Sequence, residues 1–417
     1  MFLQILFFVA ILALLGILVK QAREQRLVVV ALAILVTILP LNESFTGWSL
    51  LLASVLIVAT FVFSKSRQFT WKPMYYAIVA MYVLGFWGLL RLDYLALANR
   101  TVDTTLPMII FPILFSMVQL SKRNVVLLLR FFVWFVIVVC VYGLLSYATT
   151  VYGFSWKVAL LDGKQFSRFF MVFPLTWQPS ALSIMLLMAL PVAFYLRYHD
   201  GRQITLVEML LATILPILVL LMVGARVGVA VFPILLGLGY LFYCKLKPTV
   251  KWGLVGVAIA GLAVLLYLLP YDIRERFTDQ LRIDQRTIAI SAIKEKPILG
   301  WGIGQQRNLM ACEARIQNLG IKNPPVFHHF HNLYLDIMVK FGIVGILVLS
   351  WLIFGLLGIA IRKKHFLLLS FIAMYAIVFY FEIVLYSPRW VVVFMFWFCF
   401  LIANQEHLIS LRSNCSK

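Results

Sequence analysis

The sequence predicts an all-α integral membrane protein with about twelve or thirteen transmembrane helices and one large outward loop that contains short amphipathic helices. Hydrophobic residues make up 63% of the 417 residues and charged residues only 12%, whereas charged residues are about a quarter of an ordinary globular chain. No water-soluble core could bury that much apolar surface. The apolar residues also fall into repeated runs of roughly 17–22 residues, the length that spans a bilayer.

Thirteen apolar runs mark the expected helices in chain order. They lie at 2–19, 27–41, 48–64, 74–90, 105–120, 125–149, 179–196, 205–222, 226–244, 252–270, 343–361, 366–386 and 388–404. Two runs are weak, because 27–41 is short and ends at Pro40 and 105–120 is interrupted by prolines, so twelve is the alternative count. The first run lacks the basic start and cleavage site of a signal sequence, and we expect it to be a retained helix.

The basic residues indicate the orientation of the chain. Lys and Arg total 36 against 16 acids, a net charge of +20, which in a soluble protein would suggest a nucleic-acid partner. Here the short basic clusters fall in every second gap between the spans, and all of them therefore lie on one side, which is cytoplasmic by the positive-inside rule. They are Lys20/Arg23/Arg26, Lys65/Arg67/Lys72, Lys122/Arg123, Arg197/Arg202, Lys245/Lys247/Lys251 and Arg362/Lys363/Lys364. No nucleic-acid partner is expected.

The longest gap between spans lies on the outward side and divides the chain into three parts. Residues 1–270 hold the N-terminal helices, 271–330 form the large loop, and 331–417 hold the C-terminal helices and a cytoplasmic tail. The loop carries nine basic residues and six acids. Long loops are translocated regardless of charge, so simple solvation explains this excess, but an anionic ligand held at the outer face explains it better.

Within the loop, residues 282–297 have the pattern of an amphipathic helix that places Arg282 and Arg286 on one face. The stretch Pro297-Ile298-Leu299-Gly300-Trp301-Gly302-Ile303-Gly304 follows as a turn whose glycines permit close backbone approach. No βαβ unit surrounds it, so it is not a nucleotide-binding fingerprint.

Three of the six histidines, His328, His329 and His331, cluster where the loop re-enters the membrane. Imidazole is the natural base near neutral pH, and Asn332 and Tyr334 follow where they could orient a substrate hydroxyl or the ring. Two alternatives stay open: an interfacial belt of aromatic and His residues, and a metal held by His329 and His331. A metal is the weaker alternative, because no carboxylate or cysteine stands at a convincing spacing. We expect no metal and no cofactor.

Two arginines outside the large loop are further candidates. Arg226 lies between two apolar runs and is flanked by Gly224 and Gly228, a position at which an ionisable residue suggests function. Arg168 stands among phenylalanines just before the span that starts at 179. The planar guanidinium can pair bidentately with a diphosphate, whereas snorkelling to the lipid headgroups is the alternative for Arg226.

Two charged residues near the end of the chain are expected to have a structural role. Glu382 and Arg389 bracket a tight outward turn, and we expect them to pair with each other.

The order of these motifs resembles the O-antigen ligase and polymerase superfamily. The resemblance rests on Pro297-Ile298-Leu299-Gly300-Trp301-Gly302, on His331-Asn332-Leu333-Tyr334-Leu335 followed by Gly342 and Gly345, on the Gly224-Ala225-Arg226 turn, and on the segment from Arg168 to Pro179. It covers residues 160–350 by motif and the whole chain by topology. The sequence departs from the family at Gln178, where Asn is usual, and at Lys340, where many members have an acid, which puts a role for an acid there in doubt.

The resemblance implies a GT-C-type glycosyltransferase of the bacterial inner membrane, with an active site that faces the periplasm. Its donor would be a glycan on undecaprenyl diphosphate, and its acceptor the lipid A–core oligosaccharide. The resemblance assigns His331 as base or acceptor orienter and Arg168 and Arg226 as the diphosphate-binding residues. Arg282, Arg286, Asn332, Tyr334 and Gln178 are expected to contact substrate, in a site that also borders membrane lipid.

The resemblance favours an O-antigen ligase and leaves the polymerase of the same superfamily as the alternative, because the two share the donor and differ in the acceptor. A transporter for the lipid-linked glycan would belong to a different class. It would predict internal repeats and charged residues along several spans, and neither is apparent.

Overall fold

The computed structural model describes residues 2–22, 25–38, 43–64, 68–89, 104–150, 179–199, 202–223, 225–243, 253, 280–321, 330–386 and 388–409 of the 417-residue chain. Every regular element within these ranges is a helix, which confirms the predicted all-α integral membrane fold. Four of the helices are long and apolar enough to cross a membrane by length and composition, and eight more are apolar but shorter.

These apolar helices correspond to twelve of the thirteen predicted spans. They are α1 (Phe2–Gln21), α2 (Arg26–Ile38), α3 (Glu43–Phe63), α4 (Tyr75–Leu89), α6 (Pro107–Met117), α7 (Lys122–Thr150), α10 (Pro179–Tyr198), α11 (Leu206–Val223), α12 (Arg226–Tyr243), α18 (Leu333–Arg362), α19 (Phe366–Phe381) and α20 (Pro388–Ala403). The remaining predicted span, 252–270, lies outside the described residues except for Gly253.

Two predicted boundaries were wrong. The helix expected at 343–361 begins at Leu333, and its backbone is broken at Gly342, directly before the predicted start. The span expected at 366–386 ends at Phe381, because Glu382 is extended and a short 3-10 turn, Val384–Tyr386, follows it. In both places polar residues interrupt an apolar pattern without ending the ordered structure.

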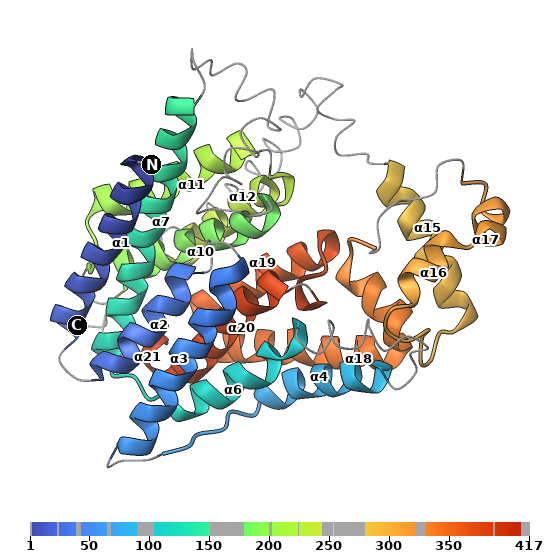
Figure 1. The fold of residues 1–417 in the computed structure, drawn as a ribbon, viewed down its shortest axis with the longest axis horizontal. Helices are drawn as coiled ribbons and strands as arrows, with labels where there is room; N and C mark the ends of the chain where they lie inside the picture. The colour runs from blue at the N-terminus through green and yellow to red at the C-terminus, as the bar shows by residue number, and fades with distance from the viewer. Residues whose placement is uncertain are drawn as a thin grey trace.

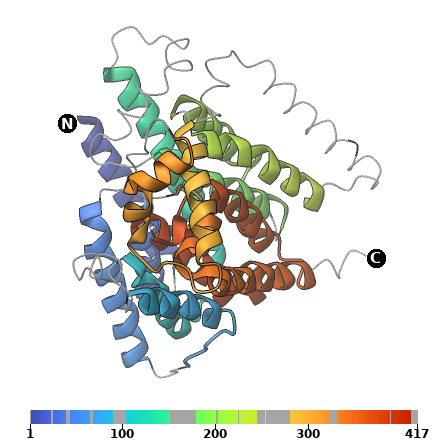
Figure 2. The ribbon, with the colours of Figure 1, turned by 90° about the vertical axis from the view of Figure 1, so that its right-hand side faces the viewer.

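The predicted loop helix is present as α15 (Gln280–Glu295), and two short helices follow it, α16 (Gln305–Ala311) and α17 (Glu313–Asn318). Figure 1 shows these three helices beside the main bundle, on its right, and Figure 2 shows them in front of the bundle when that side faces the viewer. The large loop is therefore a folded unit over its described residues.

Helix α20 forms the centre of the bundle. No residue from Trp390 to Ile402 is more than 5% exposed, and the helix packs against α6, α10 and α19. Its sequence is apolar on every face, the pattern of a helix that is buried on all sides. Edge-to-face packing of Phe132 of α7 on Trp397, with ring centroids 4.7 Å apart, ties it to its neighbours. By contrast, peripheral helices expose large apolar side chains such as Leu12, Phe63 and Phe354, which lipid would cover.

A capping box explains the acid near the start of α11. The backbone N–H of Thr205 donates to Glu208 Oε2 at 2.5 Å, and the N–H of Glu208 donates to Thr205 Oγ1 at 3.2 Å. Trp134 Nε1 donates to the other carboxylate oxygen at 3.0 Å, and Arg130 lies 3.6 Å from it. Glu208 therefore joins α11 to α7 and has a structural role.

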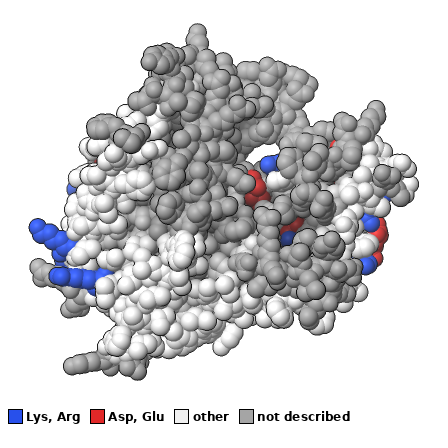
Figure 3. Space-filling model, viewed as in Figure 1, with Lys and Arg blue, Asp and Glu red and all other residues white. Residues whose placement is uncertain are grey.

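Loops that carry the predicted cytoplasmic charges meet at one end of the bundle. Gln119 connects two of them, because its side chain donates to Gln68 Oε1 at 3.0 Å and its carbonyl accepts from Gln25. Arg123 donates to the carbonyl of Gln21 at 3.3 Å. Figure 3 shows Lys and Arg side chains at the left edge of the molecule, uncharged surface beside them, and charges of both signs toward the right, around α15–α17. Which side each end faces stays a prediction.

The buried His365, between α18 and α19, makes stability depend on pH. Its Nδ1 accepts from the N–H of Leu368 at 3.2 Å and caps α19. Burial lowers the pKa of His365 to about 3, and the charges of Lys363 and His199 contribute less. Below about pH 6.5 the unfolded chain therefore binds a proton that the folded chain excludes, so stability falls as pH drops, by about 2 kcal/mol at about pH 5.

We predict that His365→Asn, which keeps a cap acceptor, weakens this pH dependence. The melting temperature of wild-type protein in detergent should fall between about pH 7.5 and about pH 5, and that of the variant should fall less. Parallel pH profiles for the two proteins would contradict this assignment.

Candidate functional site

The turn after α15 docks on the break in α18. At Gly342, φ is +62° and ψ is −150°, so the helix consists of two legs. The turn supplies hydrogen bonds on both sides of the break, because Trp301 N–H donates to the carbonyl of Val339 at 2.7 Å and Gly302 N–H donates to that of Lys340 at 2.9 Å. The N–H of Ile343 donates to the carbonyl of Pro297 at 2.9 Å. The Pro-x-x-Gly-x-Gly motif therefore fixes the large loop to α18.

Two glycines make this contact possible. A Cβ on Gly342 would overlap the carbonyl of Ile298, and a Cβ on Gly300 would lie 2.5 Å from the carbonyl carbon of Lys340. Both glycines have positive φ, which side-chain-bearing residues rarely adopt. The two motifs noted separately in the sequence are thus the two halves of one backbone contact.

A small apolar core holds α15 in place. Ile288 and Ala292 of α15 are fully buried in a cluster that also contains Phe330 and Val339 from the start of α18. Trp301 packs against this cluster, and its Nε1 donates to the carbonyl of Ala292 at 2.8 Å. Because Arg282 and Arg286 belong to the same rigid helix, their backbone positions relative to α18 are set by this packing.

The backbone of His331 is strained. Its φ is +45°, a left-handed conformation that costs a residue with a side chain about 1–2 kcal/mol. The next residue, Asn332, begins α18 as its N-cap, and its Oδ1 accepts from Leu335 N–H at 3.0 Å. Tyr334 donates to the carbonyl of Ala376 in α19 at 2.9 Å. Asn332 and Tyr334 thus anchor the segment that bears His331, and their contact with substrate stays a prediction.

Glu382 brings the loop and the histidine together. Its Oε2 lies 3.5 Å from His331 Nδ1, and its Oε1 lies 4.0 Å from Arg282 Nη2. Arg286 lies over the ring of Tyr380, with its guanidinium carbon 4.8 Å from the ring centroid. The end of α19 therefore contacts three residues that the sequence analysis selected: His331, Arg282 and Arg286.

The carboxylate of Glu382 lies on the Nδ1 side of the His331 ring. A carboxylate in that position favours the tautomer whose proton is on Nδ1, which leaves the lone pair on Nε2. The side chain of His331 is 29% exposed and that of Glu382 is 14% exposed, so neither is fully buried.

The start of α12, at Arg226, lies at the same end of the bundle as Glu382. Phe242 and Tyr243, at the end of α12, pack on Phe366 at the start of α19, with ring centroids 5.1 and 4.9 Å away. The two helices pack along each other and run antiparallel, so the start of α12 at Arg226 is at the Glu382 end.

Several predicted site residues cannot be placed. The side chain of Arg226 and the whole of Arg168, Gln178, His328 and His329 lie outside the described residues. Among the residues that the structure describes, no group of three or more His, Cys, Asp or Glu side chains is placed to hold a metal ion.

Sequence analysis missed Glu382 and Tyr380. Glu382 contacts His331 and Arg282, whereas its expected pairing with Arg389 stays a prediction because the side chain of Arg389 lies outside the described residues. A signal was present, since an acid in an otherwise apolar run is costly and suggests function. Tyr380 gave no such signal, because an aromatic residue near the end of a span is typical of any membrane helix.

Residues 211–350 match the model of a protein family described as O-antigen ligase. The matched segment runs from α11 into α18 and includes Arg226, the docked turn and His331, whereas Tyr380 and Glu382 at the end of α19 follow it. Over these residues the match supports the resemblance to the O-antigen ligase and polymerase superfamily. Arg168 and Gln178 precede the match. A comparison with curated proteins finds no match.

We predict that Gly342→Ala destabilises the protein by at least about 2 kcal/mol, because Ala fits neither the backbone angle nor the contact with Ile298. Gly358→Ala is the control, since a Cβ at Gly358 in the same helix meets nothing within 4 Å. Thermal unfolding in detergent should show a lower melting temperature for the first variant only. Equal melting temperatures for both variants would mean that the turn is not held as described.

Proposed function

We propose that the chain is an O-antigen ligase, which transfers a glycan from undecaprenyl diphosphate to lipid A–core oligosaccharide at the periplasmic face of the inner membrane. The observation that carries the proposal is the cluster in which Glu382 contacts both His331 and Arg282. It combines a base with a cationic group at one end of a membrane bundle, and both His331 and Arg282 lie within the family match. The family match supports lipid-linked glycan chemistry in general, and the ligase assignment is the proposal.

In the proposed reaction, His331 Nε2 accepts the proton of an acceptor sugar hydroxyl. The hydroxyl oxygen attacks the anomeric carbon of the donor from the face opposite the diphosphate, and the configuration inverts. The bond from that carbon to the diphosphate oxygen breaks, and its electron pair leaves with the diphosphate. Glu382 stabilises the imidazolium, since it lies 3.5 Å from Nδ1.

The departing diphosphate carries the charge that must be stabilised. Arg168 and Arg226 are proposed to bind it, with help from Arg282 and Arg286 of α15, which lie beside Glu382 and Tyr380. Fixed guanidinium groups can stabilise a developing anion electrostatically without reorganising, and in this mechanism they take the part of a metal ion. The proposal therefore requires neither a metal nor a cofactor.

We predict that His331→Ala and Arg226→Ala abolish polymer on the lipid A–core when each is expressed in a strain that lacks the gene, with a loss of about 10²–10⁴-fold for the base. His407→Ala, in the short helix at Gln405–Leu408, and Arg362→Ala, at the far end of α18, are matched controls and should restore the wild-type lipopolysaccharide pattern on gels.

The material that accumulates separates the candidate functions. Unmodified core together with free lipid-linked polymer indicates a ligase, whereas core that carries a single repeat indicates the polymerase. Full-length polymer in both active-site variants would refute the catalytic assignment.

Glu382 provides a separate prediction. Glu382→Gln should lower transfer by about 10–100-fold while the protein still folds, because the amide keeps the shape but cannot stabilise an imidazolium. Glu406→Gln removes an exposed carboxylate of α21 (Gln405–Leu408) and should leave transfer unchanged. Transfer would be measured with purified protein at equal, verified concentration. Wild-type transfer by Glu382→Gln would show that the 3.5 Å contact has no role in the reaction.

A further inference from the structure

A buried ion pair lies in the first leg of α18, outside the residues assigned to the reaction. Lys340 Nζ lies 2.5 Å from Asp336 Oδ2, one helical turn away. Asp336 has no exposed surface and Lys340 is 5% exposed. Charges are rarely buried so completely, because removing them from water costs free energy. An apolar pair of similar volume is often as stable as a buried ion pair. Stability alone therefore does not account for this pair.

Lys340 touches both of the other segments that build the site. Its Nζ lies 4.1 Å from the ring centroid of Tyr386, in the 3-10 turn that follows Glu382. Its backbone carbonyl accepts from Gly302 N–H, in the turn that follows α15. Gly300 packs against the same peptide unit.

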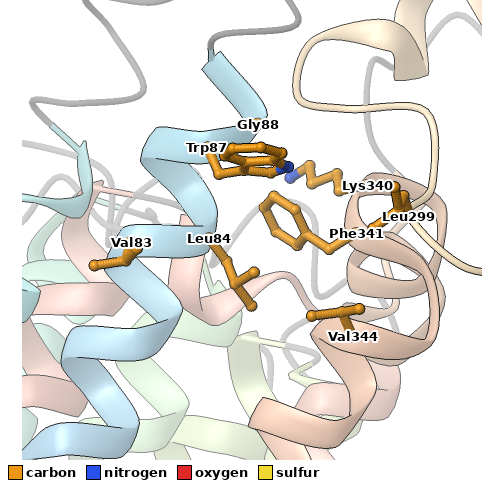
Figure 4. Close-up of a pocket in the computed structure, with 8 residues that line it drawn as sticks. All are labelled: Val83, Leu84, Trp87, Gly88, Leu299, Lys340, Phe341 and Val344. Atoms are coloured by element: carbon orange, nitrogen blue, oxygen red, sulfur yellow. The ribbon is translucent and has the colours of Figure 1, made fainter.

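The other side of Lys340 is apolar. It lines a pocket of about 290 Å³ between α4 and α18, together with Phe341, Trp87 and Leu299 (Figure 4). Leu299 belongs to the docked turn, so the pocket wall contains three separate parts of the chain. The stem of Lys340 is supported there, while its charged end has two fixed partners.

We propose that the Asp336–Lys340 pair is a positioning device that sets the arginines of α15 against His331 and Glu382. The ammonium group of Lys340 makes two directional interactions. Its ion pair with Asp336 fixes it within α18, and its contact with the Tyr386 ring fixes the turn after Glu382 against α18. The peptide of Lys340 holds the turn after α15. All three site segments therefore meet at one residue. Asp336 and Lys340 are positioning residues and contact no substrate.

This inference rests on the proposed function, so its test combines turnover with a structural measurement. The double variant Asp336→Asn/Lys340→Met leaves no unpaired buried charge and should melt within a few degrees of wild type. Its turnover should fall at least tenfold. Lys294→Met, which removes an exposed lysine of α15, is the control and should keep wild-type turnover.

Spin labels report the position of α15 directly. Ile290→Cys and Leu347→Cys place labels at exposed sites on α15 and on the second leg of α18, in protein with Cys244, Cys312 and Cys415 changed to Ser and with the buried Cys140 and Cys399 kept. The distance distribution between the labels should broaden or shift in the double variant and stay unchanged in Lys294→Met. An unchanged distribution with wild-type turnover would overturn the proposal. If even the wild-type protein has no transfer activity, the proposed function fails, and the distance distribution alone decides the positioning role.

Variants of Tyr386 test whether the contact between its ring and Lys340 matters for turnover. Its hydroxyl has no hydrogen-bond partner among the described residues, so only the ring is needed to face Lys340. Tyr386→Phe should keep wild-type turnover, whereas Tyr386→Leu should reduce turnover in the same way as the double variant. Equal turnover in both Tyr386 variants would contradict the role of the ring.

Discussion

The docking of one turn on a broken helix is the constraint on which the rest of the site depends. At Gly342 the helix α18 loses its regular hydrogen bonds, and the backbone of Pro297, Trp301 and Gly302 replaces part of them. Unsatisfied backbone groups are very costly within a membrane, so the break and the turn stabilise each other. Because α15 directly precedes the turn, this contact also decides where the arginines of the large loop lie.

Among the residues that the structure describes, charge is either placed at an end of the bundle or in the large loop, or paired. At one end, basic loops follow the pattern that orients membrane proteins. At the other, Glu382 lies between His331 and Arg282, and Asp336 neutralises Lys340. An incoming diphosphate would therefore meet cations whose positions are already fixed, which is the condition under which electrostatic stabilisation of a leaving group is effective.

The sequence was sufficient for features that depend on local pattern. Apolar runs predicted twelve of the described helices, because the bilayer sets the length of a span. The spacing of Arg282 and Arg286 predicted α15, because the repeat of the α-helix places residues four apart on one face. Contacts between distant segments could not be predicted in this way. Glu382 meets His331 only because α18 and α19 run antiparallel, and Lys340 looked like a departure from the family until its partners Asp336 and Tyr386 were seen.

The most direct test is reconstitution of the purified protein in lipid with two substrates, an undecaprenyl-diphosphate-linked glycan and lipid A–core oligosaccharide, in the presence of a metal chelator. The account predicts that glycosylated core forms at the same rate with and without the chelator. Undecaprenyl diphosphate should be released in equal amount, and the new linkage should be inverted. Transfer that stops in the chelator and resumes on addition of a divalent metal would contradict the mechanism, as would a product with retained configuration.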